Sequence, residues 1–142
     1  MGAARIIGGM AVRNPRQKWL VLLVEDDADL LKLLTRVLEQ AGFEVTTAAN
    51  GRTGLAIASG RPKPNLIISD IMMPDMDGLE MVRQIKQDPR TKPTPVIFLT
   101  SRTTPRDIIA GIGAGARHYI PKPFKMQDLL AKVNAILPQV PD

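Results

Sequence analysis

Apolar and polar positions follow two alternating patterns along most of the chain. Short apolar runs are separated by longer stretches in which apolar residues recur every three or four positions. Short runs of this kind are typical of strands buried on both faces, and the longer spacing is typical of amphipathic helices. We therefore expect strand and helix to alternate from Trp19 onward.

The pattern predicts five strands and five helices. Each strand is expected where an apolar run ends close to a polar residue: 19–24, 43–48, 65–69, 95–100 and 118–120. Each helix is expected where apolar spacing meets a start or stop signal. The expected helices are residues 28–41, 51–59, the segment marked by Leu79, Val82 and Ile85, a segment beginning at Thr104 and Pro105, and Met126 to Ile136.

Repeated strand–helix units with short connections define an α/β class. They predict a doubly wound, five-stranded parallel sheet covered on both faces by five helices, in three layers. Such sheets bind ligands at the carboxyl ends of their strands. Glu25 and Asp26, Asp70, Thr100 and Lys122 each follow or end a predicted strand. We therefore expect the functional site at this edge.

Length and composition restrict the class of protein further. With 142 residues, 44% of them hydrophobic, one compact domain is expected. No apolar run approaches the roughly 20 residues of a membrane span, and no signal peptide pattern is present, so a soluble protein without a membrane partner is expected. The chain contains no cysteine, which excludes disulfides, thiolate metal sites and thiol nucleophiles and suits a cytoplasmic protein.

The formal charge of +5 is concentrated in one segment. Residues 1–18 contain four basic residues and no acid, which leaves 15 basic and 14 acidic side chains in the remainder. Residues 1–18 are interpreted as a flexible basic extension or leader, because they show paired glycines and no sustained period. Four dispersed basic residues make a weak electrostatic surface, so no direct nucleic-acid partner is expected.

Four motifs carry a family resemblance. "VEDD", "SDIMMPDMDGLE", "VIFLTS" and "HYIPKPF" follow the predicted strands, with 44 residues from Asp26 to Asp70, 30 to Thr100 and 22 to Lys122. In order and spacing, residues 19–138 resemble the receiver domain of response regulators in bacterial two-component signalling. The resemblance implies a flavodoxin-like fold with strand order 2-1-3-4-5. Residues 139–142 would be a tail or the start of a linker.

The resemblance also implies a role for each site residue. Asp70 would accept a phosphoryl group from a histidine kinase or histidine phosphotransfer protein. Glu25, Asp26, Asp70 and the backbone carbonyl of Met72 would hold Mg²⁺, an ion that prefers oxygen ligands. A dication would explain the three adjacent acids, and Asp27 is expected to cap the following helix.

Further roles implied by the resemblance concern catalysis and output. Lys122 and Thr100 would contact the phosphoryl oxygens, and Thr100 and Tyr119 would form a switch. The peptide bond between Lys122 and Pro123 would be cis, and would direct the lysine toward the site. Output would pass through residues 104–137 to a partner or effector domain. Phosphorylation often promotes dimerisation in this family, and the sequence leaves this open.

Two alternatives remain open at this point. The first is a receiver-like interaction module that is never phosphorylated, which would be expected to lose site residues that this chain keeps. The second is a phosphatase of the haloacid dehalogenase type, which uses an aspartyl phosphate but needs a second acid two residues after the nucleophile. Met72 stands at that position.

Two further features of the sequence bear on the chemistry. "GIGAGA" at 111–116 formally fits a dinucleotide-binding pattern, but it precedes a strand, so we interpret it as a helix stop followed by a turn. Met72 and Arg102 lie two residues beyond Asp70 and Thr100. We hypothesise that these side chains obstruct the hydrolytic water and slow loss of the phosphoryl group.

Overall fold

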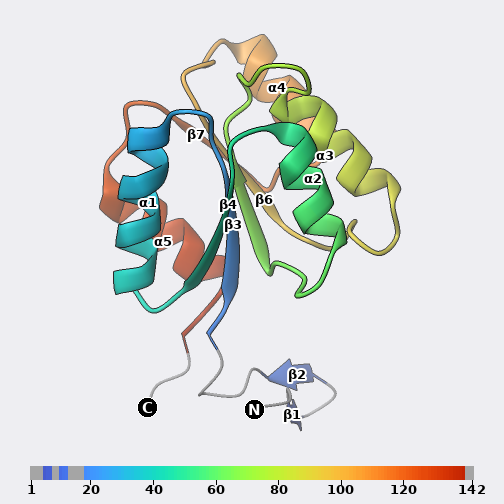
Figure 1. Ribbon diagram of the computed structural model, residues 1–142, viewed down its shortest axis with the longest axis vertical. Helices are drawn as coiled ribbons and strands as arrows, with labels where there is room; N and C mark the ends of the chain where they lie inside the picture. Colours follow the sequence, from blue (N-terminus) through green and yellow to red (C-terminus); the bar gives the residue numbers. More distant parts are fainter. Residues whose placement is uncertain (1–4, 8–9, 13–17, 140–142) are drawn as a thin grey trace.

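A computed structural model describes residues 5–7, 10–12 and 18–139 of the chain. A parallel sheet lies at its centre, with helices on both faces (Figure 1). Its strand order is β4-β3-β5-β6-β7, which is 2-1-3-4-5 when these five strands are numbered along the chain. The predicted doubly wound α/β fold is therefore confirmed. The strands are β3 (Leu20–Val24), β4 (Glu44–Ala48), β5 (Leu66–Ser69), β6 (Val96–Thr100) and β7 (His118–Pro121).

The helices pack as two layers with separate apolar cores. Side chains of alternate strand residues point to opposite faces, so Val21 and Leu23 contribute to one core and Leu22 and Val24 to the other. Leucines and a valine of α1 and α5 complete the first core, and residues of α2 and α3 complete the second. The bounds are α1 (Ala28–Gln40), α2 (Gly51–Ser59), α3 (Gly78–Gln87), α4 (Pro105–Ala114) and α5 (Met126–Ile136).

Polar residues begin four of these helices in the way the sequence indicates. Asp27, Asn50, Asp77 and Thr104 have extended backbones, and each side chain accepts a hydrogen bond from a backbone N–H in the first turn. Such caps satisfy N–H groups that have no partner within the helix. The prediction that Asp27 caps the helix after the first strand is confirmed.

The C-terminal end of α4 lies within residues 111–116, where the sequence predicts a helix stop followed by a turn. The helix continues through Gly111 and Gly113 and ends at Ala114. Only Gly115 ends the helix, with a φ of +119° in the left-handed region that favours glycine. Gly111 lies inside α4 and is buried against the ring of Tyr119.

Two strands near the N-terminus were not predicted. β1 (Arg5–Ile7) and β2 (Met10–Val12) pair in antiparallel fashion and form a separate two-stranded sheet. Segments of three residues are too short to show a period-two pattern, and the paired glycines between them in the sequence were interpreted as a sign of flexibility. The role assigned to residues 1–18 stays a prediction.

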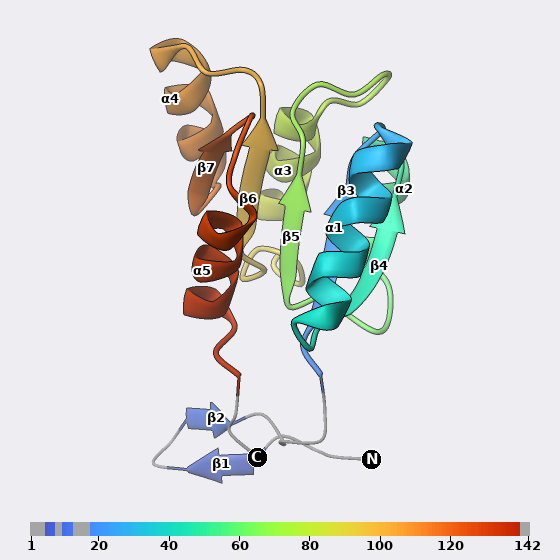
Figure 2. The ribbon, with the colours of Figure 1, turned by 90° about the vertical axis from the view of Figure 1, so that its left-hand side faces the viewer.

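The topology brings the carboxyl ends of all five main strands to one edge. The chain runs from β3 outward to β4 and then crosses β3 to reach β5, so its direction reverses between β3 and β5 (Figure 2). A crevice is expected at such a reversal. Within the described residues, no helix is both long and apolar enough to cross a membrane.

Leu33 and Leu34 offer a test of the packing of α1. Leu34 is 1% exposed in the first core, whereas Leu33, on the same helix, is 49% exposed. Leu34→Ala should lower the free energy of unfolding by about 2–5 kcal/mol because it leaves a cavity. Leu33→Ala should change it by no more than about 0.5 kcal/mol. Urea-induced unfolding measures both, and equal losses would contradict the assigned face of α1.

Candidate functional site

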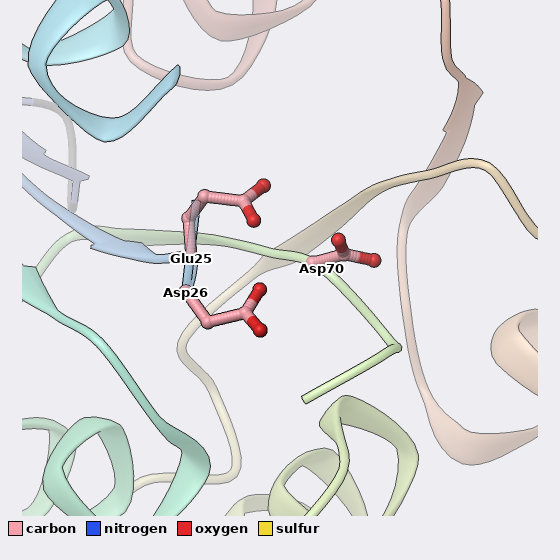
Figure 3. Close-up of side chains that lie close together, drawn as sticks. All are labelled: Glu25, Asp26 and Asp70. Carbon is pink, nitrogen blue, oxygen red and sulfur yellow. The ribbon is translucent and has the colours of Figure 1, made fainter. Parts of the chain in front are cut away.

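Three carboxylates converge at the edge where the strands end. Glu25 and Asp26 follow β3, and Asp70 follows β5 (Figure 3). One carboxylate oxygen from each lies within 4.8 Å of the other two. Glu25 and Asp70 are 4% and 7% exposed, whereas Asp26 faces solvent. Buried acids at this spacing repel one another, so a cation is needed to hold them together.

Lys122 supplies one such cation from the end of β7. Its Nζ donates to Glu25 Oε1 at 2.7 Å and to Asp70 Oδ2 at 2.9 Å. The backbone N–H of Lys122 donates to the carbonyl of Thr100 at 2.8 Å, and the peptide bond to Pro123 is cis, as predicted. The ammonium group is therefore placed between carboxylates that follow two different strands.

Burial and ion pairing act together on the pKa values of this group. Burial raises the pKa of Glu25 above its ordinary value, and the hydrogen bond from Lys122 offsets only part of that effect. Burial alone would lower the pKa of Lys122, but its hydrogen bonds and charge interactions with Glu25 and Asp70 raise it. Lys122 thus stays charged at neutral pH.

The loop after β5 orients the carboxylate of Asp70. Its Oδ1 accepts from the backbone N–H groups of Ile71 at 2.6 Å and Met72 at 3.1 Å. The N–H of Gly78, at the start of α3, donates to the carbonyl of Ile71 at 2.9 Å. A Cβ at Gly78 would lie 2.2 Å from the Asp70 carbonyl oxygen, so this close approach requires glycine.

Thr100 and Tyr119 form a second group at the same edge, joined through the backbone of Arg102. The N–H of Arg102 donates to Oγ1 of Thr100 at 3.3 Å, and the hydroxyl of Tyr119 donates to the carbonyl of Arg102. Thr100 is fully buried at the end of β6. Burial, and then the charge of Asp107, raise the pKa of Tyr119 above its ordinary value. Both side chains were predicted from the sequence, but the backbone link between them carries no sequence signal.

The remaining predicted residues line the open side of the site. Met72 is 50% exposed and lines a pocket of about 330 Å³ together with Asp26 and Arg102. Both side chains assigned to the path of a hydrolytic water therefore border the same opening. The predicted metal contact of the Met72 carbonyl stays a prediction.

The donor set fits a hard divalent cation. Carboxylate oxygens are the ligands that Mg²⁺ prefers, and this ion usually keeps several waters. Glu25, Asp26 and Asp70 offer three such oxygens, and the pocket beside Asp26 leaves room for water and a phosphoryl group. Clustered acids, a lysine and a buried hydroxyl are groups suited to phosphoryl transfer.

Comparisons with known proteins agree with this geometry. Residues 21–134 match the family model of the response regulator receiver domain. The match covers most of the chain, and the chain belongs to this family. A chemotaxis response regulator, CheY4 of Vibrio cholerae, superposes with a TM-score of 0.78 at 35% identity, covering 84% of this chain and 99% of that one.

Two curated relatives are longer than this chain. It is 38% identical over 117 residues to the transcriptional regulatory protein CpxR of Klebsiella pneumoniae, covering 82% of this chain and 48% of that protein. It is 37% identical over 117 residues to the DNA-binding dual master transcriptional regulator RpaA of Synechocystis, with the same coverage of 82% and 48%. The chain thus spans about half the length of the curated relatives it matches.

Adjacent acids allow a controlled test of metal binding. Asp26→Asn and Asp27→Asn each remove one charge, and asparagine caps a helix as well as aspartate does, so α1 is preserved. Mg²⁺ at a hundred times its Kd should raise the free energy of unfolding by about 2.7 kcal/mol. Asp27→Asn should keep this gain and Asp26→Asn should lose most of it. Thermal unfolding with and without Mg²⁺ measures the difference, and equal gains would contradict a metal site at Asp26.

Proposed function

We propose that this chain accepts a phosphoryl group on Asp70 from a histidine kinase or histidine phosphotransfer protein. The observation that carries the proposal is the arrangement of Lys122 between Glu25 and Asp70, with Asp26 beside them. This places a nucleophilic carboxylate, a fixed cation and a set of oxygen ligands at one open edge. Family membership supports the same chemistry.

In the proposed reaction, a carboxylate oxygen of Asp70 attacks phosphorus in line. A new P–O bond forms as the bond from phosphorus to the donor breaks, which leaves an acyl phosphate on Asp70. The amides of Ile71 and Met72 keep the carboxylate oriented during the attack. Mg²⁺, held by Glu25, Asp26, Asp70 and the Met72 carbonyl, would neutralise charge on the phosphoryl oxygens.

Lys122 and Thr100 complete the proposed site from the next two strands. Lys122 acts as a point charge on a phosphoryl oxygen once it exchanges its contact with Asp70 for one with the new group. Thr100 offers a neutral hydroxyl donor. The chain would catalyse its own phosphorylation and dephosphorylation and no turnover of another substrate.

The output surface is proposed to lie on α4, β7 and α5, within residues 104–137. Three isoleucines of α4 support this placement, because Ile108, Ile109 and Ile112 are among the few large apolar side chains exposed within residues 18–139, with Ile109 at 72%. A protein partner, an effector domain or a second copy would cover them. Direct nucleic-acid binding is not proposed for the chain, because its excess positive charge comes from four dispersed basic residues within 1–18. The cytoplasmic location stays a prediction.

Intact mass after incubation with acetyl phosphate and Mg²⁺ tests the phosphoacceptor. We expect one added phosphoryl group on the unmodified chain, none on Asp70→Asn, and one on Asp88→Asn, a matched change in the loop after α3. Omitting the metal should abolish the addition. No addition despite demonstrated Mg²⁺ binding would instead favour an interaction module that works without phosphorylation, and many phosphates released per chain would favour an enzyme.

The lifetime of the phosphoryl group tests the proposed obstruction of water. Met72→Asn and Arg102→Ala should each speed the decay of phosphorylated protein several-fold, because both side chains border the pocket beside Asp26. Arg106→Ala serves as the control, since Arg106 is an exposed arginine of α4 that does not line this pocket. Decay is followed by intact mass after removal of the donor. Unchanged decay in both variants would refute the obstruction.

A further inference from the structure

Helix α4 contains two interior glycines, Gly111 and Gly113, within ten residues. Glycine is among the least favourable residues in a helix interior, because it loses the most backbone freedom on folding. Neither position has the positive φ that would require glycine. Their presence therefore needs another physical reason, and the surroundings of the two residues differ.

Gly111 has a neighbour where its side chain would stand. A Cβ built there would lie 2.7 Å from Cε2 and 2.8 Å from Cδ2 of Tyr119, and 3.2 Å from Cδ2 of Phe98. Distances under 3.0 Å are too short for carbon atoms, so either the ring or the helix would have to move. A Cβ at Gly113 would meet no atom of the described residues within 4 Å.

The ring of Tyr119 is not free to yield at this position. Its hydroxyl donates to the carbonyl of Arg102, and its ring packs edge-on against Phe98, with centroids 6.1 Å apart and planes at 64°. The ring therefore has contacts on three sides: α4, β6 and the loop after β6. Moving it away from Gly111 would strain or break the hydroxyl contact.

The same residue that receives the Tyr119 hydroxyl also contacts the proposed phosphorylation site. The N–H of Arg102 donates to Oγ1 of Thr100, while its carbonyl accepts from Tyr119. A change in the hydrogen bonding of Thr100 can thus affect the Tyr119 ring through the backbone of Arg102. Such a change can affect α4 only if the ring lies against that helix.

We propose that Gly111 is a positioning residue for Tyr119: the absence of a Cβ provides the space in which the ring lies when its hydroxyl is bound to Arg102. This inference rests on the proposed function for its link to phosphorylation, but the placement of the ring does not. Gly111→Ala removes the ring position, and Gly113→Ala makes the same chemical change at a site that touches nothing described.

Tyr119 is the only tyrosine of the chain, so it can be observed alone. Uniform 3-fluorotyrosine labelling gives ¹⁹F NMR signals from this ring only. Relative to the unmodified chain, Gly111→Ala should shift the signal before any phosphodonor is added, and Gly113→Ala should leave it in place. After acetyl phosphate and Mg²⁺, Gly111→Ala should show a much reduced further shift while intact mass reports the same phosphoryl addition.

The outcomes separate this inference from the proposed function. An identical signal in Gly111→Ala and the unmodified chain would overturn the positioning role, whatever the phosphodonor does. An equal phosphorylation-dependent shift in both would overturn the link between Gly111 and the switch. Absence of phosphoryl addition to the unmodified chain would refute the proposed function, while the comparison without phosphodonor would still decide where the ring lies.

A stability cycle covers the case in which Gly111→Ala folds poorly. With Tyr119 replaced by alanine, Gly111→Ala should raise Tm by a few degrees, as is expected for Gly113→Ala, because the two contacts under 3.0 Å are gone and the gain in helix propensity outweighs the remaining contact with Phe98 at 3.2 Å. With Tyr119 present, Gly111→Ala should lower Tm or gain clearly less than Gly113→Ala. Equal gains in both backgrounds would show that the ring and Gly111 do not compete for space, and would overturn the proposal.

Discussion

The ion pairs of Lys122 are the interaction on which the site depends. Two unit charges about 4 Å apart interact by about 4 kcal/mol at an effective dielectric constant of 20, so clustered acids without a cation would disfavour the folded state. The lysine lies 97 residues from Glu25 and 52 from Asp70 in sequence, yet contacts both. Only a sheet that brings the ends of β3, β5 and β7 to one edge permits these contacts. The charged contacts of the site therefore depend on the parallel topology of the sheet.

Helix α4 is weakly anchored in the fold and lies against the ring of Tyr119. Gly111 is its only fully buried residue, whereas α1 and α3 bury large leucines, isoleucines or methionines. Few buried apolar contacts mean a small free-energy cost for displacement. Two interior glycines lower the helix propensity further. Because α4 is weakly anchored, a small movement of the Tyr119 ring can displace the helix and rearrange the isoleucines that it exposes.

The sequence allowed most of the fold to be predicted, because its signals are local. Apolar runs mark the strands, and Asp27, Asp77 and Thr104 mark helix starts whose cap geometry depends on adjacent residues. The site residues follow from motif order and from the rule that parallel strands end at one edge. Proximity of Glu25, Asp26 and Asp70, and the reach of Lys122, agree with that expectation.

The features that escaped prediction depend on contacts between distant residues. Gly111 lies inside α4, and the reason for a glycine there is the ring of Tyr119, which a Cβ at this position would meet. The link between Thr100 and Tyr119 uses backbone atoms of Arg102, which carry no signal in the sequence. Strands β1 and β2 are too short to show a periodic pattern.

The charge of the proposed site changes on phosphorylation, and a neutral hydroxyl lies where that change is felt. Three carboxylates and one ammonium leave two negative charges, which one dication cancels. Converting the Asp70 carboxylate to an acyl phosphate dianion adds one negative charge, and Lys122 would exchange its contact with Asp70 for one with the new group. Thr100 offers a buried hydroxyl at the same edge of the sheet. Any shift of this hydroxyl toward the phosphoryl group alters its bond to the N–H of Arg102, the residue whose carbonyl holds Tyr119.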